Sequence, residues 1–110
     1  MSRQVEAYIP KALEAIESLN IANDKGKVAK QFNGYIASFG ASMRQAGLLS
    51  TVLFYSNANS NAEKEREKVV KAIEMIIGYE LENNIKKSTR ADVENAAIAL
   101  KLAVRTYNLV

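Results

Sequence analysis

Residues 48–55 read Leu-Leu-Ser-Thr-Val-Leu-Phe-Tyr, and this stretch decides the fold class. Apart from Ser50 and Thr51 every residue in it is apolar, so apolar side chains surround most of the circumference of a helix. A helix that is apolar on all sides is typically enclosed by its neighbours. We therefore predict a central core helix here. We expect Leu53→Asp to unfold the protein, because an unpaired charge in a core costs several kcal/mol.

Apolar residues at helical spacing predict further helices on both sides of this stretch. Before it, the expected elements are a helix over 5–19 kinked at Pro10, a polar turn over 20–26, a helix from about Lys25 that breaks at 38–40, and a short helical turn over 41–46 that Gly47 ends in a left-handed conformation. After it, they are a loop over 56–61, a helix over 62–77 ended by Gly78, a segment over 79–87 that suits either a short helix or a loop, and a last helix opened by a capping box of Thr89 and Asp92.

These elements predict an all-α fold, a compact bundle of five or six helices in which no strand is needed. The length of 110 residues suits one core and is too short for two ordinary domains. We therefore expect a single helical domain over residues 1–110.

The composition excludes several kinds of chemistry. The chain has no cysteine and no histidine, which removes thiolate or imidazole zinc sites, disulfides, cysteine nucleophiles and serine–histidine triads. No phosphate-binding loop or dinucleotide fingerprint occurs. Glu74 is the one acid in a strongly apolar run, and its helical position predicts a solvent-facing side chain. We expect no catalytic activity, no cofactor and no metal site.

The apolar segments are too short for a membrane span. The longest, 48–55, falls far short of the ~20 residues that a bilayer requires. The first residues lack the charged and apolar regions of a signal peptide. We therefore expect a cytoplasmic protein with no membrane partner.

The basic residues suggest one candidate binding surface. The chain carries a formal net charge of +3, and Lys25, Lys27 and Lys30 cluster with only Asp24 nearby to neutralise them. With Arg44 expected to join them in space, this cluster is the best candidate for phosphate contact. Ordinary surface lysines at a junction of loop and helix would give the same pattern. A second, weaker basic cluster consists of Lys86, Lys87 and Arg90.

Residues 43–55, Met-Arg-Gln-Ala-Gly-Leu-Leu-Ser-Thr-Val-Leu-Phe-Tyr, carry a family resemblance that extends over 30–56. This stretch resembles the small α-helical subunit of the Cmr module, the type III-B CRISPR RNA-guided effector. The positions that match the family pattern are Met43, Gly47, Leu48, Thr51 and Phe54. The chain departs from the family at Gly40, where a proline is frequent, and around Leu102, where a tryptophan is frequent.

The resemblance implies a non-catalytic subunit that stacks in several copies and helps to line the groove for guide RNA and target RNA in antiviral defence. Its implied partners are the other Cmr effector subunits, both RNAs and further copies of itself. The residues then expected to contact the RNA backbone are Lys25, Lys27, Lys30, Arg44 and Arg105. The alternative is a protein-only helical adaptor that binds a partner helix and has no RNA role.

Overall fold

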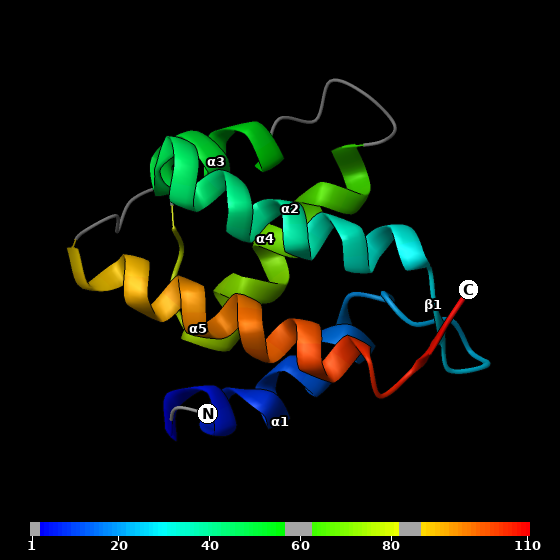
Figure 1. Ribbon diagram of the computed structural model, residues 1–110. Helices are drawn as coiled ribbons and strands as arrows, with labels where there is room; N and C mark the ends of the chain where they lie inside the picture. The colour runs from blue at the N-terminus through cyan, green and yellow to red at the C-terminus, as the bar shows by residue number, and fades with distance from the viewer. Residues whose placement is uncertain (1–2, 57–62, 82–86) are drawn as a thin grey trace.

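The computed structural model describes residues 3–56, 63–81 and 87–110, which form a helical bundle. Their elements are α1 (Arg3–Ser18), β1 (Lys27–Val28), α2 (Lys30–Ala46), α3 (Leu48–Ser56), α4 (Glu63–Ile77), α5 (Lys87–Val104) and β2 (Asn108–Leu109) (Figure 1). The predicted all-α fold is confirmed. The two strands, each of two residues, form a parallel pair that the sequence did not predict.

The core lies where α1, α2, α4 and α5 meet. α1 packs against α4 and α5, and α2 runs beside α5 in the opposite direction (Figure 1). α1 is one helix with Pro10 inside it, as expected. The largest fully buried side chains of the core include Ile16, Phe39, Met43, Ile73, Ile76 and Leu100.

α2 differs from its prediction at both ends. The helix begins at Lys30 rather than Lys25, because Lys27 and Val28 form β1. It also continues through 38–40 to Ala46, so the expected break and the separate turn over 41–46 are wrong. Phe39 and Met43 are fully buried on either side of Gly40. Burying two large side chains contributes several kcal/mol, which outweighs the ~1 kcal/mol cost of a glycine inside a helix.

α3 is not the enclosed central helix that its composition predicted. Leu48, Thr51, Val52 and Tyr55 are buried on the side that packs against α2 and α4. On the opposite side three large apolar side chains are about half exposed: Leu49 at 51%, Leu53 at 53% and Phe54 at 55%. The bundle covers only one face of α3, so the prediction that Leu53 lies in the core is wrong.

The turn between α2 and α3 depends on Gly47. Its φ of 92° is in the range that glycine adopts without a steric penalty. Its amide donates to the carbonyl of Met43 at 3.1 Å, which ends α2 as expected. Its ψ of 163° differs from the left-handed helical conformation that was predicted.

The second half of the chain confirms some boundaries and corrects others. α4 ends at Ile77, directly before Gly78 as expected. α5 begins at Lys87, so Thr89 lies inside its first turn and the predicted capping box is wrong. Of the predicted loop over 56–61, Ser56 belongs to α3 and the rest lies outside the described residues. Of the segment 79–87, residues 79–81 are not helical, and Lys87 is the first residue of α5. Residues 82–86 lie outside the described residues.

Candidate nucleic-acid interface

The turn over residues 23–27 positions two of the predicted lysines. The side-chain oxygen Oδ1 of Asn23 accepts hydrogen bonds from the backbone amides of Lys25 at 2.9 Å and Lys27 at 3.0 Å. Gly26, with a φ of 72°, closes the turn by donating to the carbonyl of Asn23. The side chain of Asn23 therefore stabilises the backbone of the turn. The side chains of Lys25 and Lys27 take no part in these hydrogen bonds and are exposed to solvent.

The strand pair fixes this turn to the rest of the molecule. Lys27 pairs with Asn108 and Val28 with Leu109 in a parallel register. Val28 is completely buried, so the strand is anchored in the core while Lys27 points outward. The amide of Lys30 donates to the carbonyl of Val110 at 2.9 Å, which connects the start of α2 to the residue that follows β2.

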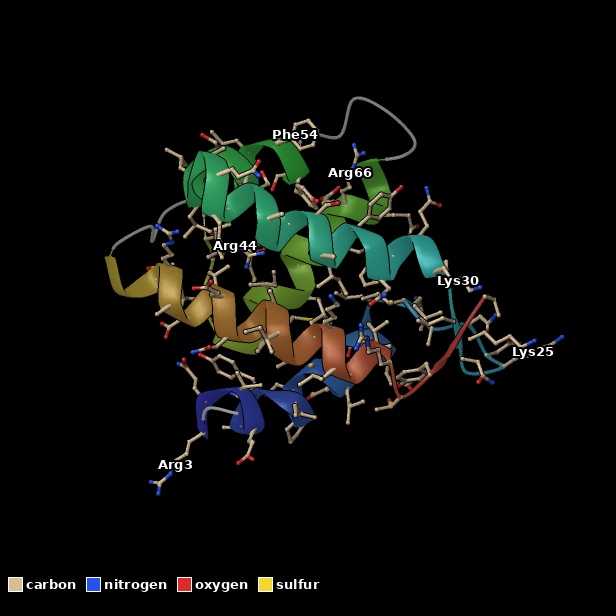
Figure 2. The ribbon with its side chains drawn as sticks, viewed as in Figure 1. Arg3, Lys25, Lys30, Arg44, Phe54 and Arg66 are labelled. Carbon is tan, nitrogen blue, oxygen red and sulfur yellow. The ribbon has the colours of Figure 1, made fainter. Side chains whose placement is uncertain are left out.

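Arg105 reaches the same end of the bundle through α5. It is exposed and directly follows this helix, and three residues later the chain enters β2. At about 3.4 Å per residue its Cα is within about 10 Å of the Cα of Asn108. Figure 2 shows Lys25 and Lys30 at this end, beside the strands. We call Lys25, Lys27, Lys30 and Arg105 the basic end.

The charges of the basic end are not neutralised within the part of the chain that the structure describes. The ion pairs found there join Arg44 to Glu94, Lys68 to Glu65 and Lys71 to Glu67. None of these pairs includes a residue of the basic end. The four cations are therefore available to an anionic ligand, with exposed Asp24 as the carboxylate beside them in sequence.

A tyrosine connects the basic end to α1. The hydroxyl of Tyr107 donates to Oε1 of Glu17 at 2.8 Å. This hydrogen bond, together with partial burial, raises the pKa of Tyr107 above its ordinary value of 10.0. The contact holds the segment between α5 and β2 against the bundle, which adds to the rigidity of the surface that carries Arg105.

Arg44 lies away from the lysines, contrary to expectation. It is about four helical turns from Lys30 along α2, roughly 21 Å at 1.5 Å per residue. Its Nη1 atom lies 4.0 Å from Oε1 of Glu94 on α5, and the two side chains are 60% and 41% exposed. An ion pair with this exposure contributes at most about 1 kcal/mol, so Glu94 holds Arg44 only weakly.

A cavity of about 200 Å³ between α2 and α5 connects Arg44 to a cation that the sequence analysis missed. We call it the α2/α5 groove, and its lining consists of Ile36, Ala37, Gly40, Met43, Arg44, Glu94, Ala97, Ile98 and Lys101. Lys101 lies four residues before Arg105, a spacing that places two side chains on the same face of a helix. This spacing is visible in the sequence and could have identified Lys101. The groove therefore leads from Arg44 past Lys101 toward the basic end.

The other sequence candidates are placed as follows. Arg90 is exposed on α5, whereas Lys86 and the side chain of Lys87 lie outside the described residues. Glu74 is half-buried rather than solvent-facing, because its Oε2 accepts the backbone amide of Leu81 at 2.9 Å. Its role is to hold the segment that follows α4.

Residues 3–56, 63–81 and 87–110 offer neither a metal-binding cluster nor a membrane-spanning helix. In these ranges no three acidic side chains are arranged to hold a metal ion. No helix there is long and apolar enough to cross a membrane.

A second surface, on α3, was not identified from the sequence. The guanidinium carbon of Arg66 lies 5.3 Å from the ring centroid of Phe54 and 5.3 Å from that of Tyr35. Figure 2 shows Arg66 and Phe54 near each other, where α3 and the start of α4 approach. We call Leu49, Ser50, Leu53 and Phe54 the α3 outer face. Its apolar residues were noted in the sequence but were assigned to the core.

Comparison with known proteins identifies a family for this chain. A family model described as CRISPR-associated protein (Cas_Cmr5) matches residues 5–107, which is nearly the whole chain. No curated protein matches, and no solved structure matches.

Proposed function

The chain belongs to the CRISPR-associated Cas_Cmr5 family, the small subunit of the type III-B Cmr complex, and we propose a role for it within that complex. We propose that it is a non-catalytic subunit that packs in several copies beside other Cmr subunits in the cytoplasm. It helps to line the groove that holds guide RNA and target RNA. Its contribution to RNA binding is to neutralise backbone phosphates, while base pairing between the RNAs supplies the sequence specificity.

The observation that carries this proposal is the basic end. Lys25, Lys27 and Lys30 are exposed, have no ion-pair partner among the described carboxylates and project from a backbone held by the strand pair. Arg105 adds a fourth charge from the residue that directly follows α5. A cluster of lysines and arginines without neutralising acids is the electrostatic surface that phosphate backbones select.

The α2/α5 groove extends this surface. Arg44 and Lys101 line the groove, and the amide of Arg105, directly after the end of α5, donates to the carbonyl of Lys101 at 3.2 Å. An RNA backbone that runs along the groove meets Arg44 first and the basic end last. Glu94 opposes the path with a single negative charge, and its weak pairing with Arg44 is replaceable by a phosphate.

The test removes the three lysines together. In a Cmr complex assembled from purified subunits, Lys25, Lys27 and Lys30 are replaced by alanine in this chain, and RNA affinity is measured against salt concentration. Each lost phosphate contact lowers the slope of log affinity against log salt by about 0.7 for single-stranded RNA, so we expect a decrease of about 2 for each copy of the chain that contacts the RNA. The fold stays intact because all three side chains are exposed.

The matched control removes the same charge elsewhere. Lys11, Lys68 and Lys71 lie on α1 and α4, outside the basic end and the groove. Their replacement by alanine is expected to leave the slope unchanged. An equal decrease in both variants assigns the effect to net charge alone, and no decrease in either rejects the basic end as an RNA contact.

The α3 outer face favours a second candidate function, a helical adaptor that binds protein only. Three large apolar side chains on this face are more than half exposed, which is a feature of protein interaction sites. The adaptor predicts assembly with the other subunits and no change in RNA affinity when the lysines are removed. The salt slope therefore separates the two candidates.

A further inference from the structure

The α3 outer face is apolar where a solvent-facing helix is normally polar. Around the helical circumference, Leu49, Leu53, Ser50 and Phe54 follow one another on the side opposite the buried residues. α3 contains no charged residue. A helix that is apolar all round is ordinarily buried on all sides. The bundle buries one side of α3, so the exposed apolar side is available to a binding partner.

We propose that the α3 outer face binds an amphipathic helix of another subunit of the effector complex, and that a carboxylate beside the apolar face of that helix pairs with Arg66. This inference rests on the proposed function in one respect, namely that the partner is a subunit of the same complex. It assigns to the chain a protein-binding surface separate from the basic end.

Arg66 defines the charge of the partner. Its guanidinium is held by two aromatic rings, those of Tyr35 and Phe54. The ring of Tyr35 is in turn fixed by its hydroxyl, which accepts from Nε2 of Gln31 at 2.7 Å. Contact with the faces of rings leaves the N–H groups at the edge of a guanidinium free to bind a carboxylate in bidentate fashion. The ion pairs of the described side chains do not include Arg66.

The shape of the surface favours a helix as the occupant. Leu49 and Leu53 are four residues apart, so their side chains form a ridge of the kind that packs into the groove of another helix. Phe54 extends the ridge toward Arg66. Leucine side chains offer a nucleobase no ring on which to stack, so two of the three exposed apolar residues contribute nothing to RNA binding.

The experiment measures binding to each of the other subunits of the complex, purified separately and treated with ribonuclease. Wild-type chain is expected to bind one of them, and Leu53→Asp to weaken that binding at least about tenfold, as loss of an interface anchor does. Arg66→Glu is expected to weaken it more than Arg66→Gln, because it places two carboxylates together. Higher salt is expected to weaken wild type more than Arg66→Gln.

The matched control is Met75→Asp on α4, a half-exposed apolar residue outside this surface, which is expected to bind like wild type. The proposal is overturned when wild type binds none of the subunits, when Leu53→Asp and Arg66→Glu bind as tightly as wild type, or when these changes abolish only self-association or only RNA binding. The lysine variants report on the proposed RNA role separately. If a subunit binds through the α3 outer face and the lysine variants leave the salt slope unchanged, this inference stands. The proposed RNA role is then rejected.

Discussion

The backbone amide of Val110 donates to the carbonyl of Val28 at 2.9 Å, so a residue that follows α5 holds the strand that carries Lys27. Val28 itself is fully buried. The basic end is therefore built from two segments about eighty residues apart in the sequence, as the pairing of Lys27 with Asn108 shows. Its rigidity depends on both segments.

Deletion of residues 108–110 tests this dependence. The amide of Lys30 loses its acceptor, the carbonyl of Val110, and is expected to exchange with solvent at least about tenfold faster. The amide of Leu19 donates to the carbonyl of Ala15, a hydrogen bond that does not involve residues 108–110. This amide is expected to keep its protection from exchange. Residue-resolved hydrogen exchange measures both. Equal protection of Lys30 before and after the deletion contradicts the structural role given to β2.

Two adjacent residues of α3 are expected to respond oppositely to the same substitution. Val52 is fully buried, so Val52→Asp is expected to lower the free energy of unfolding by more than about 3 kcal/mol. Leu53 is 53% exposed, so Leu53→Asp is expected to change it by no more than about 0.5 kcal/mol. Urea denaturation of the isolated chain measures both. A large loss for Leu53→Asp restores the central core helix that the sequence predicted.

That contrast explains part of what the sequence could and could not predict. The spacing of Phe32, Ile36 and Phe39 was sufficient to predict a helix here, because one buried stripe repeats every three or four residues. Met43 continues the same stripe beyond Gly40, where a break was wrongly expected. The composition of α3 identified a helix but not its surroundings. Apolar residues on all sides indicate a covered helix, and they do not reveal whether the cover comes from the same chain or from another.

The candidate site was predictable only in its local part. Three lysines within six residues are visible in the sequence, and the structure places them together. The strand pair was not predictable, because two residues carry no period-two pattern and their partner is distant. Arg44 was misplaced relative to the lysines because the predicted break at 38–40 would have let the chain turn back, whereas the continuous helix carries it about 21 Å away.

The pH dependence of stability is expected to involve Tyr55. Burial raises the pKa of Tyr55 above its ordinary value of 10.0, so the folded protein holds this proton more tightly than the unfolded chain. The stabilisation is complete below pH 10 and is lost as the pH rises through the folded-state pKa. The hydroxyl also donates to the carbonyl of Tyr35 at 3.1 Å.

Melting temperatures of wild type and Tyr55→Phe, measured from about pH 8 to about pH 11, test this expectation. Near pH 8 the free energy of unfolding of wild type is expected to exceed that of Tyr55→Phe by about 1 kcal/mol, the contribution of one hydrogen bond, so wild type melts at the higher temperature. The difference is expected to shrink as the pH rises. A constant difference over the whole range contradicts the involvement of Tyr55.

The weak pair between Arg44 and Glu94 predicts a gain of function. Glu94→Gln removes the carboxylate from the α2/α5 groove and frees Arg44. RNA affinity of the assembled complex is expected to rise by about two- to fivefold, which corresponds to an exposed ion pair of less than about 1 kcal/mol. Glu65→Gln is the control, because Glu65 pairs with Lys68 on α4. Equal affinities of Glu94→Gln and wild type would remove the groove from the RNA path.

The central claim, that the basic end contacts RNA, is tested most directly by ultraviolet cross-linking of RNA to protein in the assembled effector, with the linked peptides identified by mass spectrometry. The account predicts that RNA is linked to this chain within 23–30, which contains β1, and within 101–107, which directly precedes its partner strand β2. Links confined to the exposed face of α1, or to the side of α4 that carries Lys68 and Lys71, contradict it.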